Sequence, residues 1–210
     1  MSRIRTINIS QKHKFFSWTN QRTGSTHFTY MLEKFGFGSV DVDLDTMKLS
    51  NFREEIRHNH NCYLFENHLE YKFIVSVRNP YSMMISQSGV MSEKSFSEKK
   101  KLAKIRIENL IQNPITDGGC CNCFHQRKPD YFIRLENLYE DWIKVPFVKS
   151  HELRFPGELK KQTEIVMNNQ PGTEGDYWKQ FYDKSLADSV YYSQPDTFEL
   201  FGYDRNSWRE

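Results

Sequence analysis

The stretch KFFSWTNQRTGSTHFTYML, residues 14–32, decides the fold. It begins with KFFSWT, an apolar run of strand length that is rich in residues favouring β-structure. A loop centred on Gly24 follows, and apolar residues then recur at helical spacing until Gly36, where a helix is expected to end. The stretch therefore predicts a strand, a tight loop and a helix, with the loop at the amino end of the helix.

Other apolar runs extend this pattern along the chain. NCYLFE (61–66) and KFIVSV (72–77) predict two more strands, and DYFIRLENL (130–138) predicts a fourth that runs into a turn. Helical patterns follow at 81–91 and 96–113 and in the C-terminal tail, where Pro195 separates short helices. Strands that are apolar on both faces and alternate with helices predict an α/β fold with a central, mostly parallel sheet. The 210 residues favour a single domain, 1–210.

Composition and charge exclude several classes of protein. Hydrophobic residues make up 38% and charged residues 27% of the chain, which indicates a globular protein and not a disordered one. A net charge of +2 gives no argument for nucleic-acid binding. The polar N-terminus has no signal-peptide pattern, and no run approaches the roughly 20 apolar residues of a membrane span. We therefore expect a soluble, cytoplasmic protein.

The cysteines are Cys62, Cys120, Cys121 and Cys123. Without an export signal, a disulfide framework is not expected. The cluster CCNCFH could offer three thiolates and His125 to zinc, but adjacent cysteines are awkward joint ligands and no second CxxC pair follows. We expect reduced thiols and no metal.

The first loop has the chemistry of an anion site. Unpaired N–H groups and the helix dipole favour a negative group at a helix amino end. Gly24 permits a sharp turn and a close approach, Ser25 and Thr26 add hydroxyls, and Arg22 adds a planar fork of donors suited to phosphate or sulfate. The loop NQRTGST differs from a nucleoside-triphosphatase loop, which has a second glycine and a lysine before the Ser/Thr. The strand 72–77 is followed by Arg78 where an acid for Mg²⁺ would be needed, which favours a second anionic group over a metal triphosphate.

These motifs resemble those of the sulfotransferase family. QRTGST resembles the family's 5′-phosphosulfate loop, and FIVSVRNPYSMMIS resembles its 3′-phosphate motif. FIRLENLYEDW and the closing FELFGY resemble further family segments, so the resemblance extends from about residue 14 to residue 203. The compact bacterial, viral and Golgi-type carbohydrate sulfotransferases are the most similar members.

The resemblance implies a fold, a reaction and a set of nucleotide contacts. The fold would be a three-layer sandwich like that of P-loop NTPases. The reaction would transfer a sulfuryl group from 3′-phosphoadenosine-5′-phosphosulfate (PAPS) to a hydroxyl acceptor such as a glycan, without a metal, leaving 3′-phosphoadenosine-5′-phosphate (PAP). The implied nucleotide contacts are Arg22, Thr23, Gly24, Ser25, Thr26, Arg78 and Ser86, with Asn169 as a further candidate.

Catalysis by this route needs preorganised donors and a general base. Arg22 would stabilise the charge that develops on the leaving phosphate. The family places its base just after the second strand, in the segment REEIRHNHNCYLFENHLEYKF. His68 follows NCYLFE and is the first candidate, because neutral imidazole suits proton abstraction near pH 7. Glu66 and His60 remain alternatives.

Some features depart from the family pattern, and others are expected to be structural. Many members have lysine at the position of Arg22, which keeps open the alternative of a non-catalytic nucleotide- or anion-binding protein of the same fold. A kinase-like phosphotransferase is a further alternative, which Mg²⁺ dependence would separate from a sulfotransferase. RFPGELKKQ (154–162) only loosely resembles the family's second adenosine-binding stretch. We expect a structural role for Glu136, tying a strand end to neighbouring backbone or to a basic residue. DVDLD (41–45) lacks the glycine and terminal Glu of a calcium loop and is expected to be a solvated edge or loop.

Overall fold

The computed structural model describes residues 4–10, 12–19, 25–35, 38–43, 69–90, 95–112, 128–168 and 177–209. The strands are β1 (Ile4–Ser10), β2 (Phe15–Thr19), β3 (Gly38–Asp43), β4 (Lys72–Val77) and β5 (Tyr131–Arg134). The α-helices are α1 (Ser25–Lys34), α3 (Pro80–Ser88), α4 (Phe96–Gln112), α6 (Leu138–Trp142), α7 (Pro146–Arg154), α8 (Glu158–Asn168), α9 (Lys184–Ser193) and α10 (Pro195–Phe201). Two short 3-10 helices are η2 (Leu135–Asn137) and η3 (Tyr177–Phe181).

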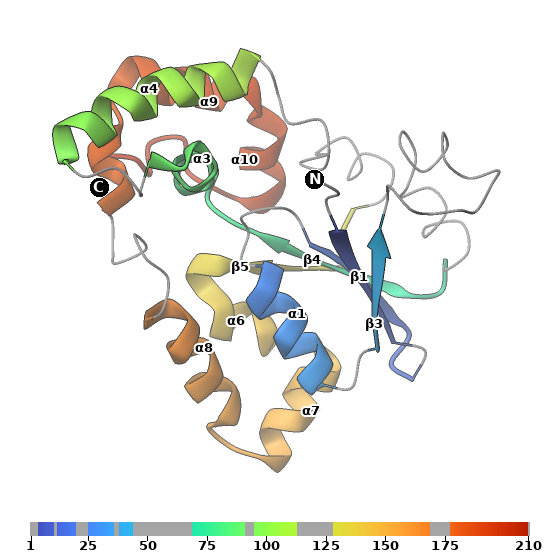
Figure 1. Cartoon of the computed structure of the whole chain (residues 1–210). Coiled ribbons are helices and arrows are strands. Elements are labelled where there is room, and N and C mark those ends of the chain that lie inside the picture. The colour runs from blue at the N-terminus through green and yellow to red at the C-terminus, as the bar shows by residue number, and fades with distance from the viewer. Residues whose placement is uncertain are drawn as a thin grey trace.

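The strands form one sheet in the order β3-β1-β2-β4-β5. β2, β4 and β5 are parallel neighbours, whereas β1 pairs antiparallel with both β2 and β3. β4 points toward α3, which lies beside α4, α9 and α10 (Figure 1). The helices α1, α6, α7 and α8 form a second group, below β4 in this view. The protein is therefore α/β with a small parallel sheet of three strands, extended by an antiparallel pair of strands.

Helices cover one face of the parallel strands through an apolar cluster. Phe15, Ile74 and Ile133 project from β2, β4 and β5 into this cluster, because alternate residues of a strand face the same side. α1 contributes Phe28, Met31 and Leu32, and Phe35 follows directly after the helix, at the spacing of one helix face. Trp142 of α6 is fully buried and stacks on Phe28, with ring centroids 5.1 Å apart. This packing fixes α1 against the sheet.

The intervening strand residues face a second cluster. Phe16, Phe73 and Val75 pack with Phe201, the last residue of α10. A third cluster joins α3, α4, η3, α9 and α10, and Tyr81 of α3 is fully buried within it. α3 is therefore held by aromatic packing just after it leaves β4.

Most elements expected in the described ranges are confirmed. The strands at 14–19, 72–77 and 130–138 correspond to β2, β4 and β5, and the expected helices correspond to α1, α3, α4, α9 and α10. The expectation for 41–45 was incomplete, because residues 41–43 belong to the edge strand β3. β1 was not predicted, because polar residues interrupt the apolar pattern of its sequence. Its pairing with β2 and β3 supports the strand on both sides. The predicted strand 61–66 lies outside the described residues.

Among the helices of the described ranges, none combines the length and the apolar composition that crossing a bilayer requires.

Candidate functional site

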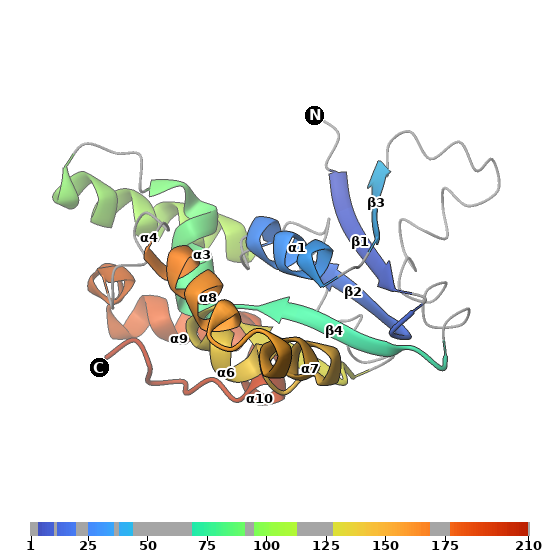
Figure 2. The ribbon, with the colours of Figure 1, turned by 90° about the horizontal axis from the view of Figure 1, so that it is seen from below.

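The three parallel strands end at one edge of the sheet. Thr19 at the end of β2 pairs with Ser76, and Val77 at the end of β4 pairs with Arg134. β4 then leads directly into α3 (Figure 2). Ligands of open α/β sheets bind outside the carboxyl ends of the strands, so this edge is the candidate functional site.

The first predicted anion-binding motif lies only partly within the described residues. Ser25 and Thr26 are the first residues of α1, and this helix contacts β1, β2 and β3. Only residues 20–24 separate Thr19 from the helix. Arg22, Thr23 and Gly24 lie in that segment, outside the described residues. The amino end of α1 therefore follows closely on the end of β2, as the sequence predicts.

The second motif forms a compact junction between β4 and α3. The Asn79 side chain accepts a hydrogen bond from the Tyr81 N–H at 3.0 Å, and Pro80 occupies the first helical position. The Asn79 carbonyl accepts the Met83 N–H at 2.9 Å. Asparagine at the N-cap and proline at the first helical position both favour a helix start here.

Arg78 lies between the last residue of β4 and this cap. It is 8% exposed, and its Nε donates a hydrogen bond of 2.7 Å to Ser82 Oγ. Ser82 Oγ in turn donates to the Asn79 carbonyl at 3.2 Å. These contacts fix the guanidinium group along the first turn of α3.

Ser86, which is predicted to bind the same 3′-phosphate as Arg78, lies on α3 one turn beyond Ser82. Residues four apart lie on the same side of a helix, so Ser82 and Ser86 follow each other along one face. Ser82 is buried and Ser86 is partly exposed. The structure therefore joins Arg78 to Ser82 directly, and Ser86 extends the same face toward solvent.

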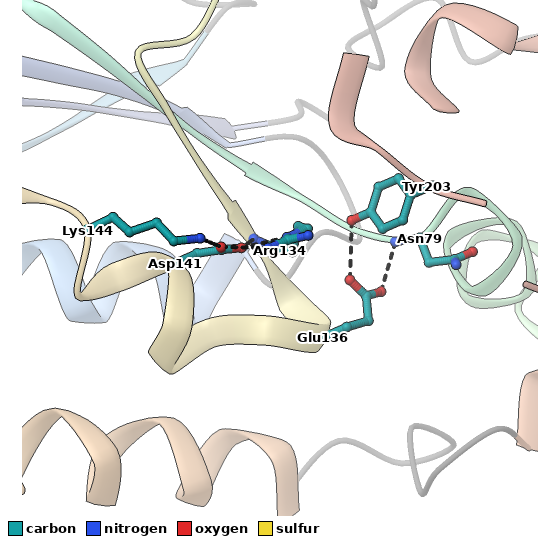
Figure 3. Close-up of polar contacts among 6 residues, drawn as sticks. All are labelled: Asn79, Arg134, Glu136, Asp141, Lys144 and Tyr203. Carbon is teal, nitrogen blue, oxygen red and sulfur yellow. Dashed lines mark hydrogen bonds and ion pairs between the residues drawn. The ribbon is translucent and has the colours of Figure 1, made fainter. Parts of the chain in front are cut away.

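Glu136, in η2, connects the ends of β4 and β5. Its carboxylate accepts the Asn79 N–H at 2.8 Å and the Tyr203 hydroxyl at 3.2 Å, so it lies between the two groups (Figure 3). The expected structural role of Glu136 is confirmed, since it ties the turn after β5 to the backbone that follows β4. Burial raises the pKa of Tyr203 well above its ordinary value, and the neighbouring Glu136 carboxylate adds to the rise. The hydroxyl therefore remains a donor at neutral pH.

Arg134, the last residue of β5, forms a separate buried ion pair (Figure 3). Its Nε and Nη2 donate to the two oxygens of Asp141, each at 2.8 Å, and its backbone N–H donates at 3.0 Å. Lys144 donates to the same carboxylate, whose side chain is 1% exposed. Burial alone would raise the pKa of Asp141, but the hydrogen bonds from Arg134 and Lys144 outweigh it and the pKa is lowered.

Several predicted site residues cannot be located relative to this edge. The candidate bases His68, Glu66 and His60, the possible nucleotide contact Asn169 and the cysteine cluster at 120–123 all lie outside the described residues. RFPGELKKQ forms the end of α7, a turn at Gly157 and the start of α8. Within the described ranges, no three His, Cys, Asp or Glu side chains are grouped so that they could hold a metal ion.

The sequence missed two contributors to this edge. Ser82 follows Arg78 by four residues, a spacing that permits contact across one helical turn, and this signal was present. The contact between Tyr203 and Glu136 spans 67 residues, and no local pattern announces it.

Comparisons with known proteins found no matching family model, no similar curated protein and no similar solved structure.

Proposed function

We propose that this protein is a sulfotransferase that transfers a sulfuryl group from PAPS to a hydroxyl acceptor such as a glycan. One observation carries the proposal. The parallel pairing of β2 with β4 brings two strand ends to the same edge of the sheet: the end of β2, which α1 follows in the chain, and the end of β4, with Arg78 and the start of α3. A nucleotide with anionic groups at both its 5′ and 3′ positions requires two anion-binding motifs side by side.

The second motif has properties suited to the 3′-phosphate. Arg78 is an arginine at a strand end whose guanidinium is oriented by a hydrogen bond to Ser82. A preoriented guanidinium group loses less conformational freedom when it binds an anion. Ser86 adds a partly exposed hydroxyl on the same side of α3. Two backbone donors at the amino end of α3, the N–H groups of Asn79 and Tyr81, are engaged by Glu136 and by the Asn79 side chain, so recognition there would draw mainly on side chains.

The transfer chemistry is assigned to residues outside the described ranges. Arg22 and the N–H groups of residues 23–26 would stabilise charge on the leaving phosphate and on the sulfuryl oxygens. His68, with Glu66 and His60 as alternatives, would take the proton from the acceptor hydroxyl. The finer classification of the fold, a three-layer sandwich like that of P-loop NTPases, is part of the same proposal. It is supported by apolar clusters on both faces of the parallel strands.

A ligand series tests the proposal on the whole chain. Thermal unfolding would be followed with PAP, AMP or ATP, each with and without Mg²⁺, since a ligand of the native state stabilises it by RT ln(1 + [L]/Kd). We expect PAP to stabilise the protein most, without Mg²⁺. Equal stabilisation by AMP would contradict the proposal, because AMP lacks the 3′-phosphate that Arg78 would bind.

The same preparation separates the alternatives. Mg²⁺-dependent stabilisation by ATP that exceeds that by PAP would favour a kinase-like phosphotransferase. A second assay would incubate the protein with labelled PAPS and a panel of saccharides and measure labelled product. Binding of PAP without transfer to any acceptor would favour a non-catalytic nucleotide-binding protein.

A further inference from the structure

We propose that the C-terminal segment after α10 positions Arg78 for anion binding. The main positioning residues for Arg78 are Tyr203 of this segment and Glu136 of η2, which Tyr203 contacts. This inference rests on the proposed function, because it concerns the binding of the 3′-phosphate. It assigns a role in that site to a segment that follows the last helix and lies far from Arg78 in the sequence.

The central contact is the Glu136 carboxylate, shared by two donors. One is the backbone N–H of Asn79, at 2.8 Å, and the other is the Tyr203 hydroxyl, at 3.2 Å (Figure 3). The Asn79 N–H belongs to the peptide unit that includes the Arg78 carbonyl. Because that unit is planar, fixing its N–H also fixes the backbone of Arg78.

Two more contacts tie the segment to the same junction. Asn79 Nδ2 donates to Ser207 Oγ at 3.1 Å, and the Tyr81 hydroxyl donates to the Arg205 carbonyl at 2.6 Å. These contacts span 128 and 124 residues of the chain. The residues on both sides of Pro80 are therefore held by Ser207 and Arg205.

The groups that make these contacts keep their protons at neutral pH. Burial raises the pKa of Tyr81 to about 12, and burial also keeps the pKa of Tyr203 well above its ordinary value. Both hydroxyls therefore donate across the physiological range.

Contacts among the described residues thus hold Arg78 at two points. Its backbone is held through Asn79, Glu136 and Tyr203, and its side chain is held through Ser82. When the first point is loosened, the strand end can shift while the hydrogen bond to Ser82 persists. The guanidinium group would then lose alignment with its anion, although the fold remains. A misplacement of about 1 Å is enough to weaken a preorganised polar contact.

Tyr203→Phe tests the inference, because it removes one hydroxyl and keeps the ring. Titration calorimetry would measure the affinities for PAP and for AMP. We expect PAP affinity to fall about fivefold and AMP affinity to stay within about twofold, since only PAP engages Arg78. Tyr71→Phe is the matched control. Its hydroxyl accepts a hydrogen bond from Lys14 at 3.5 Å, and the residue precedes β4, at the opposite end of the strand from Arg78. This control should leave both affinities unchanged.

A double-mutant cycle distinguishes positioning from general destabilisation. If Tyr203 acts through Arg78, then Tyr203→Phe should have no further effect on PAP affinity in an Arg78→Ala background. Glu136→Ala should weaken PAP binding about tenfold or more, whereas Glu136→Gln keeps an oxygen for the Asn79 N–H and should retain at least about a third of the wild-type affinity.

The outcomes separate this inference from the proposed function. If the wild-type protein binds PAP more tightly than AMP but Tyr203→Phe weakens both ligands equally or neither, the positioning role is overturned and the proposed function stands. If the wild-type protein does not prefer PAP, both are overturned.

Discussion

Two arginines at neighbouring strand ends have different partners. Arg134 ends β5 and donates to both oxygens of a carboxylate, that of Asp141. Arg78 follows β4, and its Nε donates to a neutral hydroxyl, that of Ser82. A bidentate pair with a buried carboxylate is a strong fixed contact, and the hydrogen bond from Arg78 to Ser82 orients the Arg78 guanidinium along the first turn of α3. We infer from the pair with Asp141 that Arg134 serves the stability of the edge, whereas recognition of an anion by Arg78 belongs to the proposed function.

The largest expected effect is on stability. Arg134→Ala leaves the Asp141 carboxylate, 1% exposed, without the bidentate partner that stabilises its charge. We expect a loss of about 3 kcal/mol in the free energy of unfolding, as for a broken buried ion pair. Urea denaturation would measure it. Lys144→Ala is the control: the Lys144 side chain is 60% exposed, so it should cost less than about 1 kcal/mol. Equal losses would show that Arg134 has no special role.

Arg78→Ala should reverse this pattern. We expect a loss of about 2 kcal/mol in PAP affinity, as for a lost charge-assisted contact, and a smaller loss of stability than that of Arg134→Ala. Calorimetry gives the first quantity and denaturation the second. If Arg78→Ala destabilised the fold as much as Arg134→Ala and left PAP affinity intact, the assignment of the two arginines would be reversed.

Low pH should weaken the ion pair between Arg134 and Asp141. The pKa of Asp141 is lower in the folded protein than in the unfolded chain, where it is about 3.9. Its contribution is therefore fully present above about pH 3.9 and is lost as the pH falls through the lower, folded pKa. At pH 7 we expect Asp141→Asn to cost about 1–2 kcal/mol of unfolding free energy. The difference in unfolding free energy between the wild type and Asp141→Asn should become smaller below about pH 4. Urea denaturation from about pH 7 to about pH 2.5 would measure it. A difference that stayed constant would contradict the lowered pKa.

The smallest expected effect concerns the hydroxyl that orients Arg78. Ser82→Ala removes the hydroxyl that accepts the hydrogen bond from Arg78 Nε. We expect PAP binding to weaken by about 1 kcal/mol, because one hydrogen bond contributes about that much. Ser88→Ala is a control on the same helix, because the Ser88 hydroxyl donates to the Ile85 carbonyl, away from Arg78. A larger effect of Ser88 than of Ser82 would show that the helix as a whole, and not the contact with Arg78, governs binding.

The elements with strong local signals were predictable. KFIVSV is apolar on both faces and became β4, and the spacing of Phe28, Met31, Leu32 and Phe35 indicated the buried side of α1. The helix expected at 81–91 corresponds to α3, Pro80–Ser88, which starts at an Asn79 N-cap followed by Pro80. β1 was not predicted, because the polar residues of IRTINIS give no continuous apolar pattern. The strand is stabilised by its pairing with β2 and β3.

By itself, the sequence determined the parallel strands, the helices that follow β2 and β4, and the presence of Arg78 at a strand end, because hydrophobic periodicity and capping act over a few residues. The helices α6, α7 and α8, which come next after β5, were not predicted. Only the tertiary structure decided what surrounds Arg78. The hydrogen bond from Tyr203 to Glu136 and that from Asn79 to Ser207 join segments 67 and 128 residues apart. Such contacts depend on the order of the strands and on the path of the last helix, which arise when the whole chain packs.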